Sequence, residues 1–195
     1  MSTRRSKGSA QTGLTFVELI MFIVIVGVGL AGILAVLNVT VKSSADPLIN
    51  KQMLAIAEAL MEEVAMMPFT YCDPTDADAA SATSATVGPG GCAATVENLG
   101  PDVGEARTNA ANPFNNVNDY AGLALASPIG DISGTAAAPA GYSAAIAIAN
   151  DGNLGVVGAE LPSSEVLRIT VTVTHGSDSI ALEGYRTRYA PNNLP

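Results

Sequence analysis

The sequence predicts an α+β protein in which one long N-terminal helix packs on a small antiparallel β-sheet. Three observations lead to this fold class. Leu14–Leu37 is an almost unbroken apolar run, and the following residues up to Met67 place apolar side chains at helical spacing. Near the C-terminus, two runs rich in β-branched residues flank a short turn.

The apolar run is long enough to cross a membrane. As a helix, its 24 residues reach about 36 Å, more than the roughly 30 Å of hydrocarbon in a bilayer. A basic cluster at Arg4, Arg5 and Lys7 precedes it, which predicts a cytoplasmic N-terminus and translocation of the rest. A cleaved secretory signal ending near Ser43-Ser44-Ala45 is the alternative, but its apolar core should span only about 7–15 residues.

Glu18 is the single charge within this run. With Thr15 it fits a capping box, and a negative charge in the first turn complements the helix dipole. A carboxylate near a membrane is also a functional hypothesis by default. Both interpretations can hold, and Glu18→Gln separates them because Gln also caps.

Lys7, followed by Gly13-Leu14-Thr15-Phe16-Val17-Glu18-Leu19, resembles the type IV prepilin signature. The resemblance implies a leader at 1–13, cut by a membrane prepilin peptidase between Gly13 and Leu14, and N-methylation of the new Leu14 amine. It also implies that Glu18 pairs with the Leu14 amine of its own or a neighbouring subunit. Residues 14–37 would then be the transmembrane and polymerisation helix.

Residues 38–67 are expected to form an amphipathic half-helix. Asp46 and Pro47 fit an N-cap and first helical residue, or else Pro47 bends one long helix. A stripe at spacings of three and four predicts the face that packs against the sheet: Ile49, Met53, Ile56, Leu60 and Val64. Residues 68–195 are expected to form the periplasmic or extracellular globular domain.

Cys72 and Cys92 are expected to pair, because they lie in the translocated part of the chain. The closed loop 72–92 would contribute roughly 3 kcal/mol in the chain-entropy model. Its interior is too rich in small residues to pack a core. Asp73, Asp76 and Asp78 lack the alternating order of a calcium loop, so we interpret them as a solvated acidic loop.

The middle of the chain has one landmark. Asn112 and Pro113 fit the start of a short helical turn that places Phe114, Val117 and Tyr120 on one face. Strands are expected over Tyr142–Ala149, Val166–Thr174 and Ser179–Ala190, and the last two form a hairpin over 166–190. Leu48–Met67 is the expected cover for one face of this sheet.

Catalytic and cofactor signatures are missing from the sequence. One histidine and two cysteines are too few for a zinc site, and His175 falls at a predicted turn. There is no nucleophile elbow and no phosphate-binding glycine loop. Nine Lys+Arg against 18 Asp+Glu argue against nucleic-acid binding. We therefore expect no enzyme, cofactor, metal or nucleic-acid partner.

Ala45 through the Cys72 region, together with Asn116–Tyr120, resembles minor pilins of the mannose-sensitive haemagglutinin (MSHA) pilus. The resemblance implies a structural subunit that contributes to pilus assembly or initiation after leader cleavage. Its partners would be the prepilin peptidase, the major and other minor pilins, and the inner-membrane assembly platform. It would wait in the inner membrane as a single-pass protein with a periplasmic C-terminal domain, and then reach the pilus at the cell surface. A type II secretion minor pseudopilin and a tip adhesin are the alternatives.

Overall fold

The computed structural model describes residues 15–188, and for residues 38–46 it describes only the backbone. Gly13 and Leu14, on which the cleavage and methylation predictions fall, lie outside this range, as do the last two residues of the predicted hairpin. The chain divides into two compact units, Met1–Pro47 and Leu48–Pro195.

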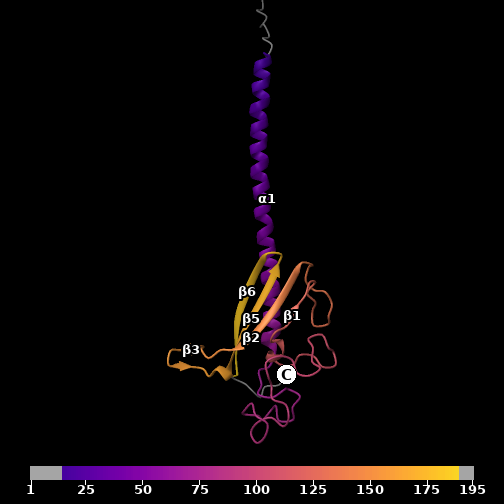
Figure 1. Ribbon diagram of the computed structural model, residues 1–195, viewed down its shortest axis with the longest axis vertical. Helices are drawn as coiled ribbons and strands as arrows, with labels where there is room; N and C mark the ends of the chain where they lie inside the picture. The colour runs from indigo at the N-terminus through magenta and orange to yellow at the C-terminus, as the bar shows by residue number, and fades with distance from the viewer. Residues whose placement is uncertain (1–14, 189–195) are drawn as a thin grey trace, which may run out of the picture. The chain divides into compact units, whose positions relative to one another are not determined.

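One helix, α1, runs Phe16–Met66 and contains Pro47 (Figure 1). The alternative in which Asp46 and Pro47 begin a second helix is therefore wrong. Proline removes one backbone hydrogen bond from a helix and favours a kink at that point. The helical segments on both sides have enough consecutive helix-forming residues to continue through this defect.

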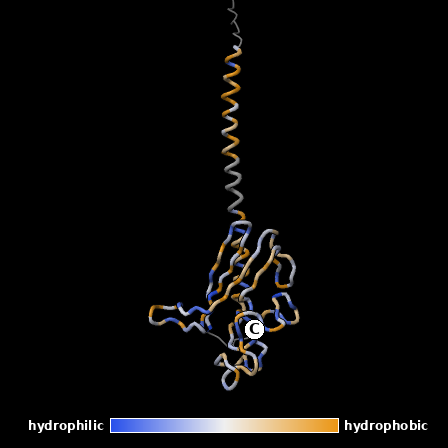
Figure 2. The backbone as a smooth tube through the Cα atoms, in the orientation of Figure 1, coloured by the Kyte–Doolittle hydropathy of each residue, from blue (hydrophilic) through white to orange (hydrophobic). Residues whose placement is uncertain are grey.

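The first unit holds the candidate membrane span. The 22 residues of Phe16–Leu37 include an 18-residue window with a mean hydropathy of 3.0, and none of that window is buried. Figure 2 shows mostly hydrophobic colour along this segment. An apolar helix without a core of its own has the composition of a membrane span, as the sequence predicted.

The second unit contains a four-stranded antiparallel sheet in the order β1-β2-β5-β6. Its strands are β1 (Ala124–Leu125), β2 (Tyr142–Asn150), β5 (Val166–His175) and β6 (Asp178–Thr187). Only Gly176 and Ser177 separate β5 from β6, and Gly176 has a positive φ of 60°, as tight hairpins require. A separate hairpin pairs β3 (Gly155–Val156) with β4 (Ala159–Glu160). A short 3-10 helix, η2 (Ser163–Glu165), precedes β5.

The core lies between the sheet and the C-terminal half of α1, over which the strands run in Figure 1. The predicted stripe faces it: Met53, Leu60 and Val64 are buried, and Ile49 and Ile56 are partly buried. The sheet contributes alternate side chains of its central strands, as period-two patterning requires: Ile146, Ile148, Leu167, Ile169, Val171 and Val173. The predicted helix-on-sheet layout is thus confirmed for this unit.

A second 3-10 helix, η1 (Val117–Tyr120), corrects the predicted turn. Its N-cap is Asn116, not Asn112, and Asn116 forms a capping box with Asp119. The capping box succeeds here because the Asp119 carboxylate accepts the Asn116 amide N–H at 2.7 Å. The aromatic residues are placed as predicted, with Tyr120 buried edge-to-face against Phe114, 5.0 Å between ring centroids.

Candidate functional site

The N-terminal end of α1 is held by Thr15. Its hydroxyl accepts the Glu18 amide N–H at 3.3 Å, and its carbonyl accepts the Leu19 amide N–H at 3.1 Å. Thr15 therefore occupies the N-cap, and Glu18 stands exposed in the first turn, where its charge complements the helix dipole. Its implied partner, the Leu14 amine, lies outside the described residues.

Cys72 and Cys92 form the predicted disulfide, with Cα atoms 5.5 Å apart. Both cysteines are fully buried, and Ala79 and Ala82 pack against them at 1% exposure each. The expectation that the 72–92 loop packs no core is therefore wrong. The bridge itself supplies enough buried surface for small alanine side chains to gather on it.

Asp76 orders this loop, so it is not a solvated loop residue. Its carboxylate accepts four backbone N–H groups at 2.8–2.9 Å, those of Asp78, Ala93, Ala94 and Thr95. These N–H groups, that of Thr95 above all, hold the pKa of Asp76 well below its usual range. Of the three aspartates interpreted as solvated, only Asp78 is exposed.

Asp73 joins a group of carboxylates that the sequence did not reveal. The isolated antiparallel bridge between Cys72 and Val96 places Asp73 and Glu97 diagonally on the same face of two short extended segments. Backbone bonds on each side hold this pairing, from Asp73 N–H to the Thr95 carbonyl and from Glu97 N–H to the Tyr71 carbonyl. Asp102 follows from the next turn. Carboxylate oxygens of Asp73, Glu97 and Asp102, which we call the acidic cluster, lie within 4.8 Å of one another.

The acidic cluster is poorly neutralised. Glu97 is 8% exposed, and neither of its carboxylate oxygens has a hydrogen-bond partner within residues 15–188; the same holds for Oδ2 of Asp102. At 4.8 Å, the upper limit of these distances, two like charges would repel by about 3.5 kcal/mol at an effective dielectric constant of ~20. Burial, reinforced by the charges of Asp119 and Asp102, raises the pKa of Glu97 to about 9. Burial also raises the pKa of Asp102.

Two further carboxylates, Glu105 and Asp119, lie close enough to act on Glu97 of the acidic cluster. Glu105 accepts the Asp102 amide N–H at 3.1 Å and the Asn115 side-chain amide at 2.8 Å. Burial, with the nearby Asp119 charge, raises the pKa of Glu105 to about 7. Burial likewise raises the pKa of Asp119, although the N–H groups of Asn115 and Asn116 oppose that shift. The negative charge is thus concentrated well beyond the three cluster residues.

Arg188 is a positive group whose field reaches Glu97. Its guanidinium carbon lies 3.7 Å from the centre of the Phe69 ring and 4.4 Å from that of Tyr71. Its ion pair, however, is with Glu165 at 3.5 Å. Burial lowers the pKa of Arg188, and the charge of Glu165 opposes that shift. Arg188 therefore offsets only part of the negative field.

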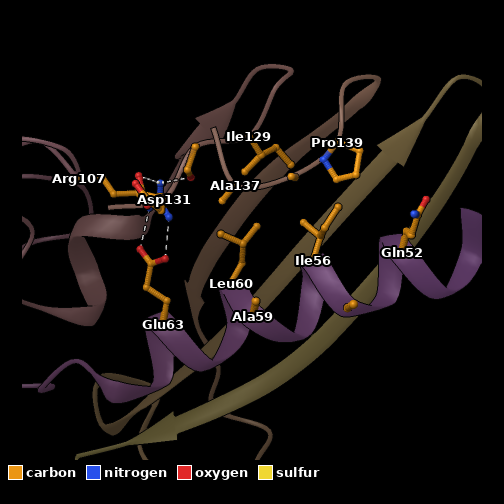
Figure 3. Close-up of a pocket in the computed structure, with 13 residues that line it drawn as sticks. Gln52, Ile56, Ala59, Leu60, Glu63, Arg107, Ile129, Asp131, Ala137 and Pro139 are labelled. Atoms are coloured by element: carbon orange, nitrogen blue, oxygen red, sulfur yellow. Dashed lines mark hydrogen bonds and ion pairs between the residues drawn. The ribbon is translucent and has the colours of Figure 1, made fainter. Parts of the chain in front are cut away.

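A second acidic position, on α1, is fully satisfied. Figure 3 shows Glu63 reaching Arg107 across one end of a cavity of about 400 Å³. Two 2.7 Å bonds join the guanidinium to the carboxylate, and Tyr120 donates its hydroxyl to Glu63 at 3.0 Å. Arg107 also donates to the carbonyls of Gly130 and Asp131. Hydrogen bonding to Glu63 raises the pKa of Arg107, and burial beside Glu63 raises that of Tyr120.

Apolar residues line the rest of this cavity. Ile56, Ala59 and Leu60 of α1 face Ile129, Ala137 and Pro139 of the opposite loop in Figure 3. The arrangement ties this loop to the helix, and no reactive pair is formed by the residues drawn there. The sole histidine, His175, lies at the end of β5, its ring 4.5 Å from that of Tyr142.

No protein-family model, curated protein or solved structure matches this chain.

Proposed function

We propose that this chain is a structural, non-catalytic minor subunit of a type IV pilus of the MSHA type. The main support for this proposal is that three features follow one another directly along the chain. The Gly13–Glu18 pattern is followed at once by a fully exposed apolar helix, and that helix continues into a segment packed on an antiparallel sheet. A membrane anchor for an unrelated domain would not need the pattern at Gly13–Glu18.

The proposed mechanism is assembly through the helix. Before assembly, Phe16–Leu37 spans the inner membrane once, with the basic N-terminus in the cytoplasm and residues 48–188 in the periplasm. After the peptidase removes residues 1–13, the assembly platform inserts the subunit among major and other minor pilins. The exposed apolar surface then exchanges lipid contacts for contacts with neighbouring helices.

Glu18 has a selective role in this proposal. An exposed carboxylate at the edge of an apolar helix is unfavourable in lipid unless a positive charge neutralises it. The Leu14 amine of a neighbouring subunit would supply that charge, and only one axial register brings the two together. Thr15 keeps the carboxylate in the first helical turn through its cap.

The test is the mass of the mature N-terminus in cells that contain the peptidase, together with filament incorporation of Glu18→Gln. We expect loss of residues 1–13, a methyl group on Leu14, and normal cleavage but poor incorporation of Glu18→Gln. Gly13→Ala is the matched variant for cleavage and should retain the leader. An intact N-terminus, or cleavage after Ala45, would contradict the proposal.

A further inference from the structure

The acidic cluster contains a buried carboxylate that nothing in the described chain satisfies. Glu97 is 92% buried by its 8% exposure, and both of its oxygens lack a hydrogen-bond partner within residues 15–188. Its oxygens point toward those of Asp73 and Asp102, since all three carboxylates approach within 4.8 Å. Buried polar groups in native proteins are almost always satisfied, so the missing partner requires an explanation.

The surroundings add negative charge to this point. Glu105 and Asp119 both act on Glu97, and Oδ1 of the fully buried Asp119 also has no partner in the described range. Arg188, a positive group whose field reaches Glu97, is paired with Glu165. The position therefore favours a positively charged ligand.

We propose that the acidic cluster binds one calcium ion, with Asp73, Glu97 and Asp102 supplying its carboxylate ligands. The donors are all oxygen atoms, which hard cations prefer, whereas zinc selects nitrogen and sulfur. Calcium takes about six to eight oxygen ligands in flexible geometry, including bidentate carboxylates. Magnesium demands a near-ideal octahedron and usually has only one or two carboxylate ligands, so three converging carboxylates fit it less well.

The cluster is open to an ion on one side. A cavity of about 340 Å³ adjoins it, lined by Asp73, Thr75, Thr95, Asp102, Glu105 and Asn112. Water molecules in this cavity can complete the coordination of an ion held by the three carboxylates. The assignment does not depend on the proposed function.

The experiment uses the full chain in detergent micelles, freed of metal with EDTA and titrated with calcium chloride by calorimetry. We expect saturable binding of one ion per chain, with a dissociation constant of about 10⁻⁴–10⁻³ M, as in extracellular calcium modules. Thermal unfolding followed by circular dichroism should shift upward with calcium and much less with magnesium. No saturable binding up to about 10⁻² M calcium, beyond the range of extracellular modules, or equal binding of magnesium, would overturn the assignment.

Three variants locate the site. Glu97→Gln and Asp102→Asn should each weaken calcium binding at least about tenfold, since each removes one charged ligand. Asp78→Asn is the matched control, because it removes an exposed charge from the same region and should bind calcium like the parent chain. Asp102 is only half-buried at the cavity edge, so its variant tests the site even if Glu97→Gln folds poorly. Calcium binding unchanged in both cluster variants would overturn the proposal.

Discussion

Glu63 and Glu97 are both shielded from solvent, yet their surroundings differ in kind. Glu63 receives two bonds from Arg107 and one from Tyr120. Glu97 receives none within residues 15–188 and faces other carboxylates. Burial alone therefore does not define a site. A carboxylate whose donors come from the chain is a fixed part of the fold, whereas one without donors requires a proton or an external cation.

The largest effect on stability is expected from breaking the ion pair between Glu63 and Arg107. Arg107→Met leaves Glu63 partly buried without its cation and should lower the free energy of unfolding by about 3–5 kcal/mol. Urea unfolding measures this loss. Arg168→Met is the matched control, because Arg168 is half exposed and its pair with Asp151 is long, so about 0–1 kcal/mol is expected. Equal losses in the two variants would refute the distinction.

The carboxyl groups around Glu97 should make the stability of the chain depend on pH. The pKa values of Glu97 and Glu105 are raised in the folded chain, to about 9 and about 7. Such groups contribute stability fully below their unfolded pKa values and lose it as pH rises through the folded ones. Without divalent cations, the free energy of unfolding should therefore fall by a few kcal/mol between about pH 4.5 and 9. Urea unfolding in EDTA across this interval checks the sign, and a rising profile would contradict it.

Glu97→Gln should remove part of that slope. In EDTA near neutral pH the folded parent chain must keep Glu97 protonated, whereas the unfolded chain ionises it freely. The neutral amide does not have this cost, so a gain of about 1–3 kcal/mol is expected. The gain should vanish below about pH 3.5, where Glu97 is protonated in both states. The same variant loses calcium binding, a combination that a damaged fold cannot produce. A loss of stability in EDTA would show that Glu97 is satisfied after all.

The smallest effect on stability is expected from removing the hydrogen bond that Tyr120 donates to Glu63. Tyr120→Phe removes one of the three bonds to Glu63 but keeps the ring edge-to-face with Phe114. Because Arg107 still neutralises Glu63, the loss should be about 1 kcal/mol. Thermal unfolding of Tyr120→Phe beside Arg107→Met gives the comparison. A loss as large as that of the arginine variant would mean that the hydroxyl, and not the cation, satisfies Glu63.

Local patterns predicted what depends on neighbouring residues in the chain. The stripe through Met53, Leu60 and Val64 follows from helical period, and the buried face of β5 follows from alternation. The disulfide followed from the expected compartment and the pair of cysteines. These predictions needed no knowledge of which segments meet in space.

The acidic cluster could not be predicted in this way. Asp73, Glu97 and Asp102 come from three separate segments that meet through one isolated bridge and a turn. Their spacing matches no calcium-loop pattern. The nearby Asp76 and Asp78 do not belong to the cluster, and Asp76 instead accepts backbone N–H groups of the loop. The predicted N-cap of η1 was wrong for a similar reason. The true N-cap, Asn116, donates its side-chain amide to the hydroxyl of Thr70, a contact between distant parts of the chain. The Glu63–Arg107 pair, 44 residues apart, gave no sequence signal either.

The disulfide has a consequence for the order of maturation. Cys72 immediately precedes Asp73. Its disulfide partner Cys92 lies shortly before Val96, which pairs with Cys72 in the isolated β-bridge and immediately precedes Glu97. Oxidation therefore fixes the two segments that carry these carboxylates and raises their effective concentration for one another. A chain still in a reducing compartment would lack this pre-organisation and would compete poorly for calcium. Formation of the disulfide would then have to precede calcium binding. Mild reduction should abolish calcium binding before the helical circular-dichroism signal is lost.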